Sequence, residues 1–434
     1  NNSGIPTSKT PLGQKKKIPN TREKSEKLRG AQLGHKKNKL EKLREEEITE
    51  RQYHELKSCL CGGELEEIGY KIKDEIELEI RINKIEHRFY EYKCIKCGKK
   101  INVPIPNRLK EENQYGPNVQ ALALSLLNKG CVSYNRTRSL IREFSGQEID
   151  MSEGYLVKLQ KKCAKGLEEF INDLKKQIIN EKVINWDDTV ISINKKNACL
   201  RFYGTSKLAL YTAHERKNKD GLDKDNILNQ LTDDKVVIHD HNTINYNSDY
   251  NFQNAECCVH LIRDLKKVSD NLNHQWSNKL IKLLTEVNSK RKEYLEIGKE
   301  FFEEDIIETV SNQYDICIND GKEENKKDSN KYYYQEEKAL LNRLVKYKEN
   351  YLLWVCRFDI DFSNNLSERS LRFSKTKMKV SGQFQNISTA KDYSIINSYL
   401  ETCKRNDIDV HHAIRCLIEN NPLKLNDILK GSKY

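Results

Sequence analysis

Residues 361–372 read Asp361-Phe362-Ser363-Asn364-Asn365-Leu366-Ser367-Glu368-Arg369-Ser370-Leu371-Arg372. Ser and Asn favour helix N-caps, because their short side chains accept hydrogen bonds from first-turn N–H groups. The stretch therefore predicts a helix with Glu368 in its first turn, and Glu368 shares a face with Arg372 four residues later. On its own, this pattern is most often a capped surface helix with a weak ion pair. A functional role for Glu368 depends on the acidic residues that precede it in the chain.

The composition is that of a long, highly charged chain with a basic excess. Its 434 residues allow roughly two to four domains and a sizeable core. A net charge of +11 favours a polyanionic partner, although most of so dense a charge mixture is solvated surface. The sequence has no apolar run long enough for a membrane span and no signal peptide. Thirteen cysteines, an odd number spread along the chain, indicate a reducing cytoplasm rather than a secreted disulfide framework.

Residues 1–52 form a basic, apolar-poor segment in which Gly and Pro recur. This composition predicts a largely disordered arm. The arm is either a plain linker or a segment that lies along DNA phosphates, and the two interpretations are compatible. Because the chain opens with Asn1 rather than Met, we expect a further segment before it. The lysines that would contact DNA in the arm are Lys15, Lys16, Lys17, Lys36 and Lys37.

Two cysteine pairs follow, Cys59/Cys61 and Cys94/Cys97, each with a glycine directly behind it. Four thiolates in a small unit predict a structural Zn²⁺ site of the zinc-ribbon type. Charged and β-branched residues alternate over residues 75–82, which predicts a strand hairpin between the pairs. The first pair has one residue between its cysteines and so makes a tighter turn than usual. The alternative is a small β-unit with four free cysteines.

Further along, helical patterns give way to strands. Residues 109–182 have helical apolar spacing with basic faces, which is typical of a DNA-binding unit or of a structural bundle. Three strands with short gaps then predict an antiparallel meander. A helix near residues 226–231 and a short buried strand at 235–241 come next, and this order predicts a ribonuclease-H-like α/β fold. The three meander strands are expected at residues 183–193, 198–204 and 208–212.

The expected domains follow from these patterns. They are a basic arm (1–52), a zinc-ribbon-like DNA-binding domain (53–108), a helical linker or DNA-binding region (109–182), a ribonuclease-H-like catalytic domain (183–406) with a helical insertion at about 270–350, and a C-terminal helical tail (407–434). The insertion is expected to be interrupted by the polar residues 319–331.

Three carboxylates stand out within the predicted catalytic domain. Asp187 lies in the middle of an apolar strand, Asp240 ends another strand, and Glu368 opens a helix. Buried carboxylates are costly unless they are paired or bind a cation. An oxygen-rich site of three acids suits Mg²⁺ or Mn²⁺, and two such ions can activate the water or 3′-hydroxyl that attacks a phosphodiester. Each acid alone could be an ordinary surface carboxylate, and the nearest rivals are Asp188, His239 and Asp361.

A basic segment follows Glu368. Residues 372–384 are expected to form a loop, because alternate lysines would present their charges on one side of an extended segment. His241 and His260 are weaker candidates for groups that support the acids, since a lone histidine is more often structural. The residues expected to hold DNA phosphates are Arg369, Arg372, Lys375, Lys377 and Lys379.

These motifs resemble those of transposases of the insertion sequence 66 family, which are DDE-type enzymes, and the resemblance covers nearly the whole chain. Asp188 stands where the family has Glu, and Ser363 where it has Asp. The stretches that carry the resemblance are the arm segment 29–36, the two cysteine pairs, Tyr115-Gly116-Pro117, Asp187-Asp188-Thr189, Val237-Ile238-His239-Asp240, Cys257-Cys258-Val259-His260-Leu261-Ile262-Arg263 and Asn364-Asn365-Leu366-Ser367-Glu368-Arg369.

The resemblance implies that Asp187, Asp240 and Glu368 are the catalytic, metal-binding residues. It implies a protein that binds the terminal repeats of an insertion sequence, hydrolyses the DNA there and joins the 3′-hydroxyl to target DNA. We expect double-stranded DNA as partner, a homo-oligomer on DNA, accessory proteins of the same element, and a bacterial, nucleoid-associated location without membrane contact. The residues expected to support the acids are His260, Arg263, Asn364 and Asn365.

Two other functions compete with this interpretation. One is a catalytically inactive, zinc-dependent DNA-binding protein derived from a transposase. The other is an RNA-guided nuclease, for which we would expect the acids in the order Asp, Glu, Asp and a zinc ribbon inside the catalytic domain.

Overall fold

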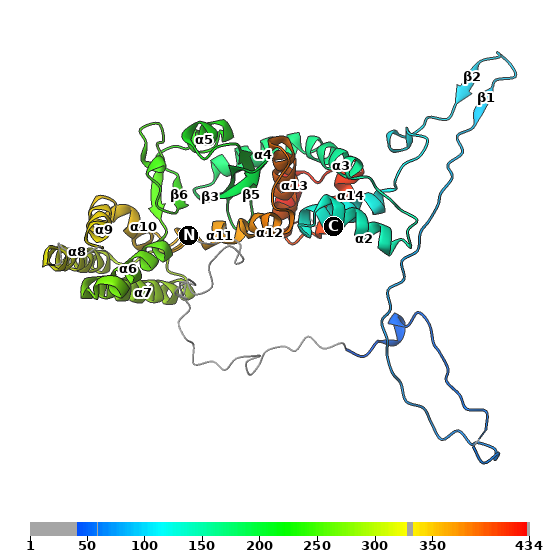
Figure 1. The fold of residues 1–434 in the computed structure, drawn as a ribbon, viewed down its shortest axis with the longest axis horizontal. Coiled ribbons are helices and arrows are strands. Elements are labelled where there is room, and N and C mark those ends of the chain that lie inside the picture. Colours follow the sequence, from blue (N-terminus) through cyan, green and yellow to red (C-terminus); the bar gives the residue numbers. More distant parts are fainter. Residues whose placement is uncertain (1–40, 59, 328–332, 432–434) are drawn as a thin grey trace. The chain divides into compact units, whose positions relative to one another are not determined.

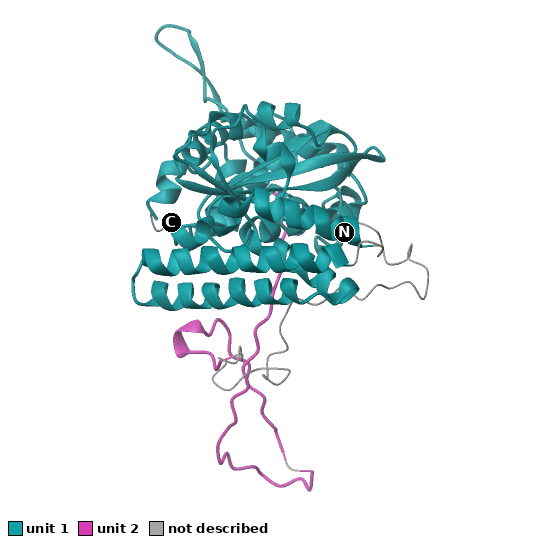
Figure 2. Ribbon diagram, turned by 90° about the vertical axis from the view of Figure 1, so that its left-hand side faces the viewer, with its two compact units in different colours: residues 1–15, 87–434 teal, residues 16–86 magenta. Residues whose placement is uncertain are grey.

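The computed structural model describes residues 41–58, 60–327 and 333–431. These residues divide into two compact units, with residues 41–86 in the smaller and residues from 87 onward in the larger (Figure 2). The lysines expected to contact DNA from the arm, Lys15, Lys16, Lys17, Lys36 and Lys37, lie outside the described residues.

The smaller unit has little regular structure over its described residues. A short 3₁₀ turn, η2, spans Glu45–Glu47. Residues 75–82 form no strand, so the hairpin predicted there is wrong. The apolar side chains of this stretch are exposed, for example Leu78 at 80%. A two-stranded ribbon is marginal in water unless it can cover an apolar face, and these side chains have no such cover within the unit.

A short antiparallel pair, β1 Glu91–Lys93 and β2 Lys100–Asn102, flanks the second cysteine pair at the start of the larger unit. The turn between them is closed by the Gly98 N–H, which donates to the Cys94 carbonyl at 2.8 Å. Gly98 has a φ of +72°, a conformation that glycine adopts without steric cost. The turn therefore holds Cys94 and Cys97 on one tight loop.

A five-stranded mixed sheet forms the centre of the larger unit, with strand order β5-β4-β3-β6-β7. Figure 1 labels three of its strands, β3, β5 and β6. The first three strands form the predicted antiparallel meander, whereas β6 and β7 run parallel to β3. The bounds are β3 Val183–Ile193, β4 Lys196–Gly204, β5 Ala209–His214, β6 Val236–His239 and β7 Gln253–Glu256. The α/β class and the strands predicted from the pattern are confirmed.

Strand alternation assigns the residues of β3 to two faces of the sheet. Ile184 and Trp186 pack into one apolar cluster, and Ile191 and Ile193 pack into another on the opposite face. Asp187 falls on the second face and Asp188 on the first. The parallel register pairs Asn185 with Ile238 of β6, so that Asp187 and Asp240 continue from this pair on the same face.

Helices before and after the sheet share one core. It contains Leu124, Leu156 and Leu174 from the first group and Tyr399 and Leu417 from the second. The first group is α1 Pro117–Leu124, the π-helical turn η4 Ser125–Lys129, α2 Tyr134–Phe144, α3 Glu153–Lys165 and α4 Glu168–Asn180; the second is α13 Ile387–Arg405, α14 Val410–Ile418 and α15 Leu425–Leu429. Residues 109–182 thus pack together with the C-terminal helices.

A second core is built from the helices that follow β7. Trp276, Tyr314, Leu341 and Trp354 are fully or almost fully buried in it. The predicted interruption from residue 319 is wrong over the described residues, because α8 continues to Lys327. The helices are α6 Cys258–Leu272, α7 Gln275–Glu296, α8 Glu304–Lys327, α9 Tyr334–Lys346 and α10 Lys348–Cys356.

Two further predictions of local structure are wrong. The helix expected near 226–231 lies earlier, as α5 Lys219–Asp225, because Asn226 ends it in a left-handed conformation; only the 3₁₀ turn η5 Leu228–Gln230 follows. The basic loop expected at 372–384 is mostly a helix, α12 Arg372–Ser381, directly behind α11 Asn365–Ser370. None of the helices in the described part of the chain has the length and apolarity needed to cross a lipid bilayer.

Candidate active site

Asp187 is a half-buried carboxylate in the middle of β3. Its Oδ1 accepts a hydrogen bond of 2.7 Å from the backbone N–H of Asp188. Burial raises the pKa of Asp187 to about 7, and the negative charge of Asp240 adds to this rise. The two carboxylates therefore lie close enough to repel each other, as the register of β3 and β6 requires.

Asp240 follows the C-terminal end of β6 and faces α6. Its Oδ1 is buried and accepts no hydrogen bond of normal geometry, although His260 Nδ1 lies 2.9 Å away. A buried carboxylate oxygen without a hydrogen bond is costly, and a bound cation is one of the few ways to offset that cost. Asp240 thus has the character of a cation ligand.

Glu368 lies in α11 and reaches the same neighbourhood. Its Oε1 is 3.6 Å from His260 Nε2 and 3.5 Å from Arg263 NH1. The two charged neighbours of Glu368 thus come from α6, and the expected partner Arg372 is instead exposed on the next helix. His260 contacts Asp240 with one ring nitrogen and Glu368 with the other, so it brings these two acids together.

The His260 ring is held in place by several polar contacts. Its Nδ1 lies 3.4 Å from Cys257 Sγ, and Arg263 NH1 lies 2.9 Å from its Nε2. Burial alone would lower the pKa of His260, but its contacts with Asp240 and Cys257 raise it to about 10. The contacts at Nδ1 therefore favour the protonated ring, whereas the contact of Arg263 with Nε2 favours the neutral one.

Asn364 connects the helix of Glu368 to the strand of Asp187. Its side chain donates to the Trp186 carbonyl at 2.8 Å and accepts from Asn185 Nδ2 at 3.0 Å. Asn364 is completely buried. It stands at the N-cap of α11, but its side chain makes no capping hydrogen bond, contrary to the capping role expected from sequence. Asn365, by contrast, is exposed.

The rival acids and histidine are placed elsewhere. Asp188 lies on the opposite face of the sheet, where its Oδ1 pairs with Lys217 Nζ at 2.5 Å. Asp361 is exposed. His239 is buried, and its Nε2 lies 2.8 Å from Asn254 Oδ1. Asp187, Asp240 and Glu368 therefore stay the predicted ligands of Mg²⁺ or Mn²⁺, ions that prefer carboxylate oxygens, and one oxygen of Asp240 is buried without a hydrogen bond of normal geometry.

The basic residues after Glu368 divide into exposed and buried. Lys377 is only 5% exposed, and its Nζ donates to the Val132 carbonyl at 2.6 Å. A lysine held in this way cannot bind a phosphate, so the expected DNA contact at Lys377 is wrong. The helix explains why: residues two apart on a helix point to different sides. The exposed members of the set are Arg369, Arg372, Lys375 and Lys379.

The four cysteines of the predicted zinc site are only partly described. Cys59 lies outside the described residues, and Cys61 belongs to the smaller unit. Within the larger unit, hydrogen bonds from Cys97 lower the pKa of the Cys94 thiol, which favours the thiolate form that binds zinc. The zinc ribbon therefore stays a prediction.

Cys257 is a site residue that the sequence reasoning did not single out. It precedes α6, is 1% exposed, and lies with Asp240 and His260 in a group whose possible ligand atoms are all within 4.8 Å of one another. Asn364 N–H donates to its Sγ at 3.1 Å. The Cys-x-x-His spacing at the helix start was the available signal, since residues three apart on a helix share a face.

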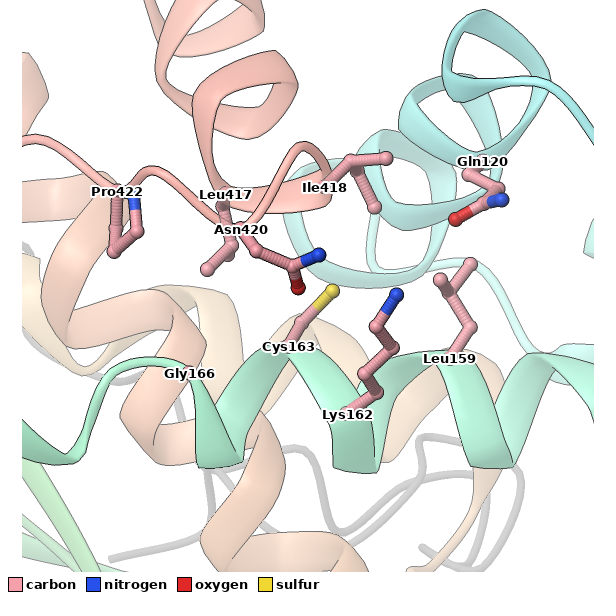
Figure 3. A pocket seen from close by; sticks show the side chains of 9 residues that line it. All are labelled: Gln120, Leu159, Lys162, Cys163, Gly166, Leu417, Ile418, Asn420 and Pro422. Carbon is pink, nitrogen blue, oxygen red and sulfur yellow. The ribbon is translucent and has the colours of Figure 1, made fainter. Parts of the chain in front are cut away.

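Two hollows of the larger unit differ in size and place. A small one, about 50 Å³, lies between α3 and α14 near Cys163 and Leu417 (Figure 3). It has room for only a few water molecules, and none of the three acids lines it. A larger hollow of about 540 Å³ lies between α6 and α9 and reaches His241, the residue after Asp240.

Comparison with known proteins gives one family. A family model described as "Transposase IS66 family" matches residues 112–392. The matched range begins before α1, contains the whole sheet and all three acids, and ends within α13. A search among curated proteins finds no match.

Proposed function

Because the chain belongs to the transposase IS66 family, we propose that it is a DNA transposase that cleaves the ends of an insertion sequence and joins them to target DNA. In this proposal Asp187, Asp240 and Glu368 hold Mg²⁺ or Mn²⁺. When bound, these ions lower the pKa of an attacking water or hydroxyl and neutralise charge on the leaving oxygen.

The observation that carries the proposal is the position of His260 between two of the acids. Its ring nitrogens lie 2.9 Å from Asp240 and 3.6 Å from Glu368, residues that are 128 positions apart in the sequence (368 − 240). The register of β3 and β6 puts Asp187 on the same face as Asp240, and the pKa of Asp187 is raised by burial and by the charge of Asp240. Divalent cations bind where carboxylate oxygens lie close together, and these contacts support such an arrangement of Asp187, Asp240 and Glu368.

The chemistry proceeds in two displacements at phosphorus. In the first, a water oxygen attacks the phosphorus at the element's end, the bond to the 3′-oxygen breaks, and that oxygen leaves as a 3′-hydroxyl. In the second, the freed 3′-hydroxyl attacks a target phosphodiester and displaces another 3′-oxygen. The exposed residues Arg369, Arg372, Lys375 and Lys379 are proposed to hold the flanking phosphates.

The sheet order supports a ribonuclease-H-like core for this chemistry. Three antiparallel strands are followed by two parallel ones, and the acids stand on the central strand and just beyond its parallel neighbour. The helical insertion proposed at about 270–350, between the second and third acids, corresponds to α7, α8, α9 and the start of α10. An order of Asp, Asp and Glu argues against the RNA-guided nuclease considered above.

Binding of the DNA ends is proposed for three parts of the chain, namely the basic arm, the cysteine-rich segment with structural Zn²⁺, and α2. Arg136 and Arg142 are exposed on α2, whereas Arg138 is engaged by Asp150 at 2.6 Å. Assembly as a homo-oligomer on DNA and help from accessory proteins of the element complete the proposal.

Replacing Glu368 with Gln tests the function. The E368Q variant keeps the size of the side chain but loses a metal-binding charge, so end cleavage and strand transfer with Mg²⁺ or Mn²⁺ should disappear. Binding to terminal-repeat DNA in a mobility-shift assay should stay near the wild-type level. Wild-type protein that binds the ends but never nicks them would instead favour the inactive DNA-binding alternative.

A further inference from the structure

We propose that Asp240, Cys257 and His260 form a binding site for a thiophilic divalent cation of the Zn²⁺ class. The site shares Asp240 with the proposed catalytic carboxylates but differs from them in its donor atoms. Its existence does not depend on the transposase proposal; only its effect on DNA cleavage rests on that function.

The distances between the three possible ligand atoms are already close to those found in a metal site. His260 Nδ1 is 2.9 Å from Asp240 Oδ1 and 3.4 Å from Cys257 Sγ, and all three atoms lie within 4.8 Å of one another. In a tetrahedral Zn²⁺ site with bonds of about 2.0–2.3 Å, ligand atoms lie about 3.3–3.8 Å apart. Small side-chain movements therefore suffice to bring the triangle to coordination geometry.

One carboxylate oxygen of Asp240 has the surroundings expected of a metal ligand. Asp240 Oδ1 is buried and accepts no hydrogen bond of normal geometry, so it is available as a ligand. The Cys257 sulfur is oriented by the backbone N–H of Asn364 at 3.1 Å, the kind of supporting contact that fixes a ligand in place. The side chains of His260 and Asp240 are 33% and 30% exposed, which leaves a fourth position open to water.

The donor set selects the class of ion. A thiolate, an imidazole and one carboxylate suit Zn²⁺, Co²⁺ or Cd²⁺, whereas Mg²⁺ prefers oxygen ligands alone. Coordination by Nδ1 leaves the ring proton on Nε2, which faces Glu368 Oε1 at 3.6 Å, and a carboxylate in that position orients a metal-binding histidine. Arg263, which now lies 2.9 Å from Nε2, would turn away, because two N–H groups cannot share one hydrogen bond.

Cobalt titration of the full chain, with a matched pair of cysteine variants, tests the site. Co²⁺ bound to a thiolate absorbs in the near ultraviolet. The Cys257→Ser variant should bind one Co²⁺ fewer per chain than wild type and lose the corresponding absorption. Cys258→Ser is the control, because Cys258 is the adjacent residue, is equally buried, and directs its Sγ to the Tyr351 carbonyl instead.

The cysteines of the predicted zinc ribbon are present in every variant, so their contribution cancels in the difference. Asp187→Asn should keep the near-ultraviolet absorption of this thiolate-bound Co²⁺, since Asp187 is not part of this donor set, whereas His260→Gln should lose the same single ion, and its absorption, as Cys257→Ser does. Equal Co²⁺ stoichiometry in wild type, Cys257→Ser and His260→Gln would overturn the proposal. If Cys257→Ser does not fold, the comparison of His260→Gln with Asp187→Asn decides alone.

Asp240 belongs both to this site and to the proposed catalytic site, so Zn²⁺ binding can also be measured through its effect on DNA cleavage. Because Zn²⁺ bound here would compete with the catalytic Mg²⁺ for the Asp240 carboxylate, Zn²⁺ added to a Mg²⁺-supported cleavage reaction should inhibit it, and excess Mg²⁺ should relieve the inhibition. A protein that binds the extra Co²⁺ but never cleaves DNA would retain the metal site and refute the proposed function, so the two failures are distinguishable.

Discussion

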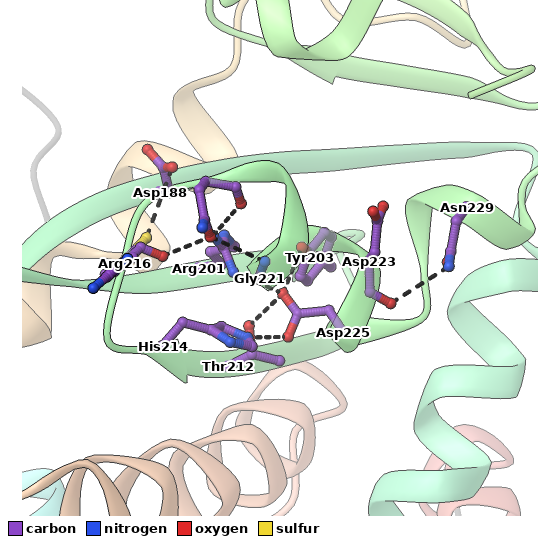
Figure 4. A network of polar contacts seen from close by, with 12 residues as sticks. Asp188, Arg201, Tyr203, Thr212, His214, Arg216, Gly221, Asp223, Asp225 and Asn229 are labelled. Carbon is purple, nitrogen blue, oxygen red and sulfur yellow. Dashed lines mark hydrogen bonds and ion pairs between the residues drawn. The ribbon is translucent and has the colours of Figure 1, made fainter. Parts of the chain in front are cut away.

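Carboxylates on the two faces of the central sheet differ in how many hydrogen-bond donors surround them. On the face that Asp188 occupies, Asp225 is 3% exposed and accepts from Arg201, Tyr203, Thr212 and His214 (Figure 4). On the other face, Asp187 and Asp240 repel each other, and a buried oxygen of Asp240 accepts no hydrogen bond of normal geometry.

This difference separates a structural acid, Asp225, from the two acids proposed to bind metal. A buried carboxylate surrounded by donors and by a guanidinium has its charge fully offset and needs no further ligand. Two acids short of donors are costly to bury and persist where a cation completes them. Neighbouring residues of one strand, Asp187 and Asp188, therefore have different roles because their side chains point to different faces.

The largest effect on strand transfer is expected when the acid on each face is replaced separately by asparagine. Asp187→Asn should reduce Mg²⁺-dependent strand transfer by roughly a thousandfold or more, because it removes a charge that acts only when metal is bound. Asp188→Asn should stay within about threefold of wild type, since its carboxylate pairs with Lys217 away from the site. A plasmid-based strand-transfer assay measures both. Equal losses in the two variants would remove the distinction between the faces.

For the free energy of unfolding, we expect the larger loss on the Asp188 face, where Asp225 is fully paired. Asp225→Asn leaves Arg201, which is 1% exposed, as a buried charge without its partner, and should cost about 3–5 kcal/mol of unfolding free energy. The control is Asp223→Asn in the same helix α5, where the partly exposed pair with Lys219 should contribute about 1 kcal/mol or less. Urea unfolding followed by circular dichroism gives both values. A small effect at Asp225 would mean that its four donors find other acceptors.

A smaller effect on strand transfer is expected from Asn364, which links α11 to β3. Asn364→Ala removes the link from α11 to Trp186 and Asn185, so Glu368 loses its fixed position and strand transfer should fall about 10–100-fold. Asn365→Ala, an exposed neighbour, should leave activity unchanged. Unfolding curves of both variants separate loss of positioning from loss of the fold. Unaltered activity in Asn364→Ala would show that other contacts hold α11.

The smallest effect is expected from Lys377, a buried lysine of α12. Lys377 donates to a neutral carbonyl, and burial lowers its pKa to about 8. Between about pH 8 and pH 10.5 the unfolded chain keeps a proton that the folded chain has lost, so stability should rise with pH over this range. Lys377→Met should abolish that rise in thermal unfolding measured across the range. An unchanged slope would assign the effect to other groups.

Part of this architecture could be predicted because it depends on short-range patterns. The bounds of β3 match the prediction, since alternating apolar residues report strand faces directly. The acids on β3 and after β6 were singled out from the strand pattern, and Glu368 from the N-cap residues before it. The basic helix α12 was predicted as a loop, because the alternating lysines suggested an extended segment, whereas Ser374 and Lys377 turn inward at helical spacing.

Contacts across long separations could not be predicted from patterns. Cys257 belongs with Asp240 and His260 only because β6 ends beside the start of α6. The burial of Lys377 against Val132 joins residues 245 apart, and no local signal encodes it. The helices at residues 117–180 and 387–429 share a core for the same reason.

By itself, the sequence determined which side chains could carry charge, metal or strand structure, because those properties belong to each residue and its near neighbours. Only the tertiary structure decided which acids lie together and which are neutralised. The pairing of β3 with β6 and the position of α11 set the distances between charges, and distance and burial, rather than residue type, determine whether a carboxylate is stable without a cation.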